Sequence, residues 1–204
     1  MASEKTKMKR ITALTTVISL FGFLYKLGLG IYGMSLVLII ASISTLMVFI
    51  CKLMFVKNVT KSRKDKKKAY LYIILSCFIY SLIFLLFIVL KVNGIDISSQ
   101  KEYEGWLGAL LIGLMLVMFI LSILKLKGAL DKTDLMVIGL KEITFFSALA
   151  DLVIIESYAY GIYITYQTPL DVLVIINNYF PLLMAGLMIV TAFIMFIRYL
   201  KYKV

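Results

Sequence analysis

The sequence predicts an all-α, polytopic integral membrane protein with six transmembrane helices arranged as three hairpins. Of the 204 residues, 62% are hydrophobic and 16% are charged. Soluble proteins contain about 45–50% apolar and about 25% charged residues. The hydrophobic residues also gather in long runs, and basic residues lie between alternate runs, as the positive-inside rule requires of cytoplasmic loops.

The apolar runs set the boundaries of the spans, each of which reaches the about 20 residues that a bilayer requires. They cover residues 11–29, 31–56, 70–92, 106–126, 135–166 and 170–198. No small-residue cleavage site follows the first run, so we expect it to be retained rather than removed as a signal peptide. Gly28, Gly30 and Gly33 predict a tight turn before the second span. The chain is expected to form a single transmembrane domain.

The charges of the loops predict that both termini are cytoplasmic. In this orientation 17 of the 22 Lys and Arg residues lie in the cytoplasmic segments 1–10, 57–69, 125–134 and 198–204. Removing or adding a span would place a basic loop outside. The most basic loop, residues 57–69, is expected to fix this topology, and contact with anionic lipid head groups is a further expectation for it.

The fifth span, residues 135–166, is expected to organise the rest of the chain. It is the only apolar run with acidic residues in its interior, namely Glu142, Asp151 and Glu156. A carboxylate at membrane depth is costly, so this helix should face other helices or water rather than lipid. Glu142 is expected at the interface, either solvated or screened by the neighbouring Lys141.

A candidate solute or ion site is predicted between the fifth and sixth spans. A tight antiparallel hairpin brings Glu156 and Tyr158 to the depth of Asn177 and Asn178. Pro181 cannot donate to the carbonyl group of Asn177, and interrupted helices at mid-membrane mark binding sites in transporters. The alternative is that these polar groups only join the helices by hydrogen bonds.

Asp151 and Lys26 are further charged residues expected at membrane depth. Asp151 is predicted to act as a second proton or cation relay. Lys26 lies close to the outer end of the first span, and we expect its long side chain to extend to the outer surface. In the alternative interpretation Lys26 pairs with Glu156 and makes that carboxylate a structural counter-ion.

The fourth span carries small residues at four-residue spacing, Gly105, Ala109 and Gly113. Such a stripe allows close approach of another helix. We expect this packing contact inside the bundle, and a contact with another chain is the alternative.

Several functions are excluded by residues that the sequence lacks. It contains no histidine and only two separated cysteines, Cys51 and Cys77, which we expect to be buried small hydrophobes. Zinc binding and histidine-based catalysis therefore lack ligands, and no hydrolase or P-loop motif is present. We predict no enzyme activity, no metal and no cofactor. The net charge of +11 is explained by topology rather than by nucleic-acid binding.

Two functions agree with these observations. The first is a small carrier or channel, or the membrane substrate-binding subunit of a transport complex, with its polar site between the fifth and sixth spans. The alternative is a non-transporting membrane partner, such as an assembly, immunity or regulatory subunit of a larger complex. The expected partners are the lipid bilayer and a second copy or another membrane protein. The composition, rich in Lys, Ile and Leu, favours the plasma membrane of a microbe.

Overall fold

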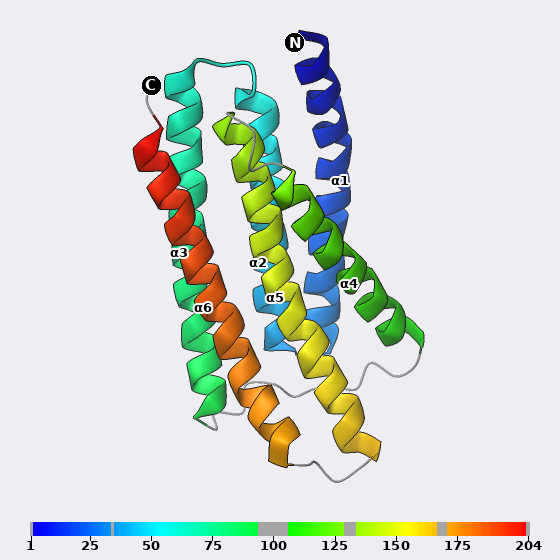
Figure 1. Ribbon diagram of the computed structural model, residues 1–204. Helices are drawn as coiled ribbons and strands as arrows, with labels where there is room; N and C mark the ends of the chain where they lie inside the picture. Colours follow the sequence, from blue (N-terminus) through cyan, green and yellow to red (C-terminus); the bar gives the residue numbers. More distant parts are fainter. Residues whose placement is uncertain (1, 34, 94–105, 129–133, 167–170, 203–204) are drawn as a thin grey trace.

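The protein is a bundle of six α-helices in the computed structural model (Figure 1). The structure describes residues 2–33, 35–93, 106–128, 134–166 and 171–202. The helices are α1 (Ala2–Tyr32), α2 (Leu36–Asn58), α3 (Arg63–Val92), α4 (Trp106–Lys127), α5 (Leu135–Tyr166) and α6 (Asp171–Lys201). The all-α prediction is therefore confirmed for the described residues.

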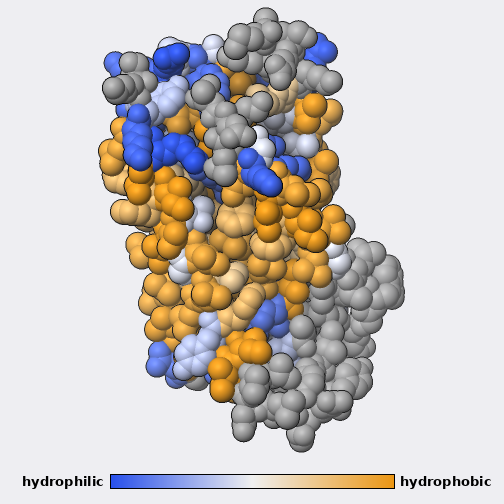
Figure 2. Space-filling view, in the orientation of Figure 1, coloured by the Kyte–Doolittle hydropathy of each residue, from blue (hydrophilic) through white to orange (hydrophobic). Residues whose placement is uncertain are grey.

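Among the described residues, four stretches of helix are long and apolar enough to cross a membrane. They lie in α1, α2, α3 and α6, over Met8–Tyr32, Leu36–Asn58, Arg63–Val92 and Val174–Lys201. Large apolar side chains on these helices point away from the bundle; Leu14 and Phe21, for example, are 71% and 67% exposed. Figure 2 shows the result, a broad hydrophobic belt with hydrophilic residues gathered mainly at the upper end. Exposed apolar surface of this extent is typical of contact with lipid or a partner protein.

Helix α5 lies at the centre of the bundle and packs against α2, α3, α4 and α6. No residue from 135 to 157 is exposed. The expectation that this helix faces protein rather than lipid is confirmed over that range. The three acidic residues that make lipid contact unfavourable, Glu142, Asp151 and Glu156, are thus surrounded by neighbouring helices.

The prediction of three hairpins is wrong for the middle pair of helices. Helices α1 and α2 pack together, as do α5 and α6, but α3 and α4 do not pack against each other in the described residues. Helix α3 lies against α6 instead, and α4 lies against α5. Residues 93–105 join α3 to α4, and a connection of this length does not force neighbouring helices into contact, as a short turn would.

The turn between α1 and α2 comes later in the chain than predicted. Helix α1 continues to Tyr32, so Gly28 and Gly30 lie inside it, and α2 begins only at Leu36. Ser35 begins the next helix as its N-cap, and its hydroxyl oxygen accepts a hydrogen bond from the backbone N–H of Leu38 at 3.4 Å.

The basic segment 57–69 is also mostly helical rather than a loop. Helix α3 begins at Arg63, with Ser62 as its N-cap. The Ser62 hydroxyl accepts from the backbone N–H of Asp65 at 3.3 Å and donates to the Asp65 carboxylate at 2.8 Å. This capping arrangement extends the helix beyond the apolar run, because capping satisfies backbone donors that would otherwise lack partners.

Gly30 is required for the close packing of α1 on α2. A Cβ atom at Gly30 would lie 2.8 Å from Ile39 Cγ1 and 3.0 Å from the Ile39 backbone nitrogen, whereas a Cβ at Gly28 would meet no atom within 4 Å. We expect Gly30→Ala to lower the free energy of unfolding by about 1–3 kcal/mol through overpacking. Gly28→Ala, the matched control, should be neutral or stabilising by up to about 1 kcal/mol, since alanine favours helix.

Unfolding of both variants in mixed micelles, followed by circular dichroism during titration with a denaturing detergent, measures the difference. Equal stability of the two variants would contradict the close approach of α2 to Gly30.

Candidate functional site

Helix α5 carries a carboxylate in each of three polar layers, and each layer contains a basic side chain from a different helix. The layers are Glu142 with Arg198 of α6, Asp151 with Lys26 of α1, and Glu156 near Lys91 of α3.

The first layer is a buried hydrogen-bonded ion pair. Glu142 is 3% exposed and forms a salt bridge with Arg198, while the Tyr70 hydroxyl donates to Glu142 Oε2 at 2.6 Å. Glu142 is therefore not a solvated interfacial residue, and its partner is Arg198 rather than Lys141. The reason is packing: α3 approaches so closely that a Cβ at Gly139 would lie 2.8 Å from the Tyr70 ring. This closeness excludes solvent from the carboxylate.

The second layer joins α1, α2 and α5. Lys26 Nζ lies 2.5 Å from Asp151 Oδ1 and 3.0 Å from Thr45 Oγ1, and the two charged side chains are 10% and 14% exposed. The expectation that Lys26 extends to the outer surface is wrong, and it pairs with Asp151 rather than with Glu156. Because α1 packs on α2, and α2 on α5, the face of α1 that carries Lys26 points into the bundle. Both charges are balanced within the chain, which favours a structural role for this pair.

The third layer combines residues of α3, α5 and α6. Lys91 Nζ donates to Asn177 Oδ1 at 3.4 Å, and the opposite charges of Lys91 and Glu156 attract each other. Glu156 Oε2 is buried and has no hydrogen-bond partner among the described residues. The Ser157 hydroxyl oxygen is also buried without a hydrogen-bond partner among the described residues. Buried polar atoms are rarely left unpaired, which makes this layer the candidate for a further partner.

Lys91 is the member of this layer that sequence reasoning missed. It lies in the last turn of α3, where a basic residue reads as an interfacial anchor. The side chain instead turns inward to Asn177, because α3 packs against α6 and α5. The signal was present in the sequence as a lysine at the end of an apolar run, but only the helix order assigns it a partner.

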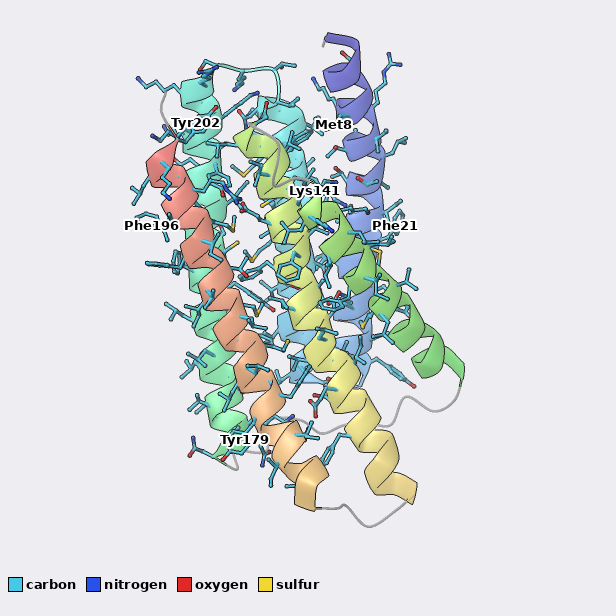
Figure 3. The ribbon with its side chains drawn as sticks, in the orientation of Figure 1. Met8, Phe21, Lys141, Tyr179, Phe196 and Tyr202 are labelled. Atoms are coloured by element: carbon cyan, nitrogen blue, oxygen red, sulfur yellow. The ribbon has the colours of Figure 1, made fainter. Side chains whose placement is uncertain are left out.

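Other residues predicted for this site are only partly described. Asn178 is half-buried and forms no hydrogen bond with the described residues, and the side chain of Tyr158 lies outside them. Pro181 lies inside α6, which is continuous from Asp171 to Lys201. The interruption predicted at Pro181 is therefore not observed, and the neighbouring Tyr179 is exposed near the lower end of the bundle (Figure 3).

Of the predicted small-residue stripe, the structure describes only Gly113. Gly113 is exposed, and a Cβ atom built there would meet no described atom within 4 Å. Gly105 and the side chain of Ala109 lie outside the described residues. The expected packing inside the bundle is thus not observed at Gly113.

The two cysteines, Cys51 and Cys77, are free and buried, which confirms that they act as small hydrophobic residues. Neither contributes to the three polar layers. Among the described residues, no group of three or more Cys, Asp and Glu side chains is arranged to hold a metal ion.

No model of a known protein family matches this chain, and no curated protein or solved structure does. The site is accordingly argued from its own chemistry. It combines a carboxylate, an amide and an ammonium group, which together accept and donate hydrogen bonds. This set suits a cation or a small polar solute.

Proposed function

We propose that all six helices cross a membrane, with both termini in the cytoplasm, and that the protein is a small carrier or channel, or the membrane substrate-binding subunit of a transport complex. The start of α1, the connection between α2 and α3, and the end of α6 lie at one end of the bundle (Figure 1). The basic segment 57–69 belongs to this end, which supports its assignment to the cytoplasm. The hydrophobic belt in Figure 2 would then face the lipid chains.

The observation that carries this proposal is the unpaired carboxylate oxygen of Glu156. Of the three acidic side chains inside α5, Glu142 and Asp151 are bound to basic side chains by salt bridges. Glu156 forms no salt bridge among the described residues: Lys91 and the adjacent Ser157 stabilise its charge, and its Oε2 is buried without a hydrogen-bond donor from the described side chains. A bound solute, cation or proton would supply the missing partner, and intramembrane carboxylates of this kind are typical of transport pathways.

The layer lies inside the helices but toward the lower end of the bundle. Glu156 lies ten residues before the end of α5, and Asn177 six residues after the start of α6. At a rise of about 1.5 Å per residue, these positions are about 15 Å and about 9 Å from the helix ends. Lys91 lies in the last turn of α3. A solute could therefore reach this layer from that end.

Glu156→Gln tests the proposal because it removes the charge and keeps the shape. We expect this variant to lower one of two measured quantities at least about tenfold: the retention of a co-purified solute, or the uptake of Na⁺, K⁺ or protons by proteoliposomes. A tenfold loss is the effect of removing one charge-assisted hydrogen bond. Native mass spectrometry measures retention, and ion-sensitive dyes measure uptake.

Asp65→Asn is the matched control, since Asp65 is an exposed carboxylate at the start of α3. It should leave retention and uptake unchanged. If Glu156→Gln has no effect in any assay that detects activity of the unmodified protein, the third layer is structural and the transport proposal fails.

A second candidate function is a non-transporting membrane partner. It is favoured by α4, which packs only against α5 in the described residues and leaves Gly113 open. Isolation in a mild detergent, followed by native gel electrophoresis, distinguishes the two functions. A stoichiometric complex that is lost on Gly113→Leu substitution would support the partner function, and an unchanged monomer would argue against it.

A further inference from the structure

Three lysines from three helices lie together near the upper end of the bundle, and none of them belongs to the three polar layers of α5. Lys52 belongs to α2, Lys125 to the end of α4 and Lys141 to the first part of α5, where Figure 3 shows it beside the end of α4. Two contacts place these lysines at one depth, because α5 runs antiparallel to α2 and α4 (Figure 1). The Ser44–Ser147 hydrogen bond sets Lys52 about level with the turn Gly139–Lys141. The stacked rings of Phe119 and Phe145 set Lys125 about level with the same turn.

Among the described residues, Lys52 forms hydrogen bonds with neutral groups only. Its Nζ donates to the Thr15 carbonyl oxygen at 3.0 Å and to the Ser19 hydroxyl oxygen at 2.6 Å, both on α1. An ammonium group has three N–H donors. Two bonds to neutral oxygens therefore leave one donor, and they leave the positive charge without a counter-ion.

The carboxylates whose side chains the structure describes are all engaged elsewhere. Asp65 accepts from Ser62, and the others face basic side chains outside the cluster: Asp134 with Lys66, Glu142 with Arg198, Asp151 with Lys26, and Glu156 with Lys91. Three like charges that lie close together in a partly buried place are unfavourable unless an anion joins them. The described chain provides no such anion.

From this arrangement we propose that Lys52, Lys125 and Lys141 form a binding site for a phosphate group, the head group of an anionic lipid being the favoured source. Lysine is a common phosphate ligand because its compact charge and rotating donors match the phosphate oxygens. Lys125 is exposed and the other two lysines are half-buried, so a ligand can reach the cluster from the surface.

The position of the site favours a lipid over a soluble phosphate. In the proposed topology the cluster lies at the cytoplasmic interface, where lipid head groups lie. The residues next to Ser19 and Lys125 include Ile18 and Leu124, which are 68% and 61% exposed and would face acyl chains. The inference thus rests on the proposed topology, but it does not require solute binding at Glu156.

The site is tested by titrating the full-length, delipidated protein in detergent with phosphatidylglycerol and counting bound lipids by native mass spectrometry. We expect each Lys→Gln substitution in the cluster to weaken binding about fivefold. The triple variant should weaken it more than about tenfold. Lys9→Gln/Arg10→Gln/Lys201→Gln is the matched control, with the same change of charge at exposed basic residues outside the cluster and outside segment 57–69.

Two further variants separate binding from folding. Lys125→Gln alone changes an exposed side chain and leaves the bundle intact, and Lys52→Arg keeps the charge and should retain binding. Competition by inorganic phosphate would identify a soluble phosphate as the ligand, and no competition would identify the lipid. Equal loss in the cluster and control variants, or no loss in either, would overturn the proposal. These results do not depend on the transport assays, so the two proposals fail separately.

Discussion

Replacing Asp151 with asparagine is expected to lower the free energy of unfolding by about 3–5 kcal/mol, the usual cost of breaking a buried ion pair from one side. The substitution leaves the Lys26 ammonium group inside the bundle with only the Thr45 hydroxyl as a partner. Unfolding by a denaturing detergent in mixed micelles, followed by circular dichroism, measures the loss.

The double variant Lys26→Met/Asp151→Leu is the decisive control for this pair. It removes both charges, so it should be closer in stability to the unmodified protein than either single variant. If Asp151→Asn and Lys26→Met are each harmless, and the double variant equals their sum, the pair does not hold α1 against α5.

The second large effect is expected for Glu142→Leu, at about 2–4 kcal/mol of unfolding free energy. This change removes the acceptor of the fully buried Tyr70 hydroxyl and leaves Arg198 without its counter-ion. The same unfolding assay measures it.

Tyr70→Phe is the comparison, because it deletes one hydrogen bond and keeps the ion pair. It should cost only about 1 kcal/mol. A Glu142→Leu variant as stable as Tyr70→Phe would contradict the view that the Glu142–Arg198 pair fastens α6 to α5.

The sequence predicted where each helix begins and ends better than it predicted which helices pack together. Helices α4 and α5 lie over the predicted ranges 106–126 and 135–166 with a difference of one residue at most, because apolar runs bounded by charged and polar residues define the ends. Helices α1 and α3 extend beyond their apolar runs into basic segments. Helix formation there follows capping and propensity, which hydrophobicity alone does not measure.

The partners of the charged residues were harder to predict. Glu156 and Asn177 were expected at one depth, but Lys91 enters from α3, which is distant in sequence, and Lys26 pairs with Asp151. Which basic side chain meets which carboxylate depends on the order of helices around α5. A single sequence gives depth along each helix but not this order, and the failure of the predicted α3–α4 hairpin has the same cause.

The central claim, that all six helices cross the membrane, is tested most directly by labelling single cysteines in intact cells with a membrane-impermeant maleimide. The positions are Lys61, Gln100, Lys132 and Thr168, one in each of four connections, in a chain where Cys51 and Cys77 are replaced by serine. Six spans with cytoplasmic termini predict labelling at 100 and 168 from outside, and at 61 and 132 only after permeabilisation. Labelling of 100 and 132 from the same side would show that α4 does not cross, and would contradict the account.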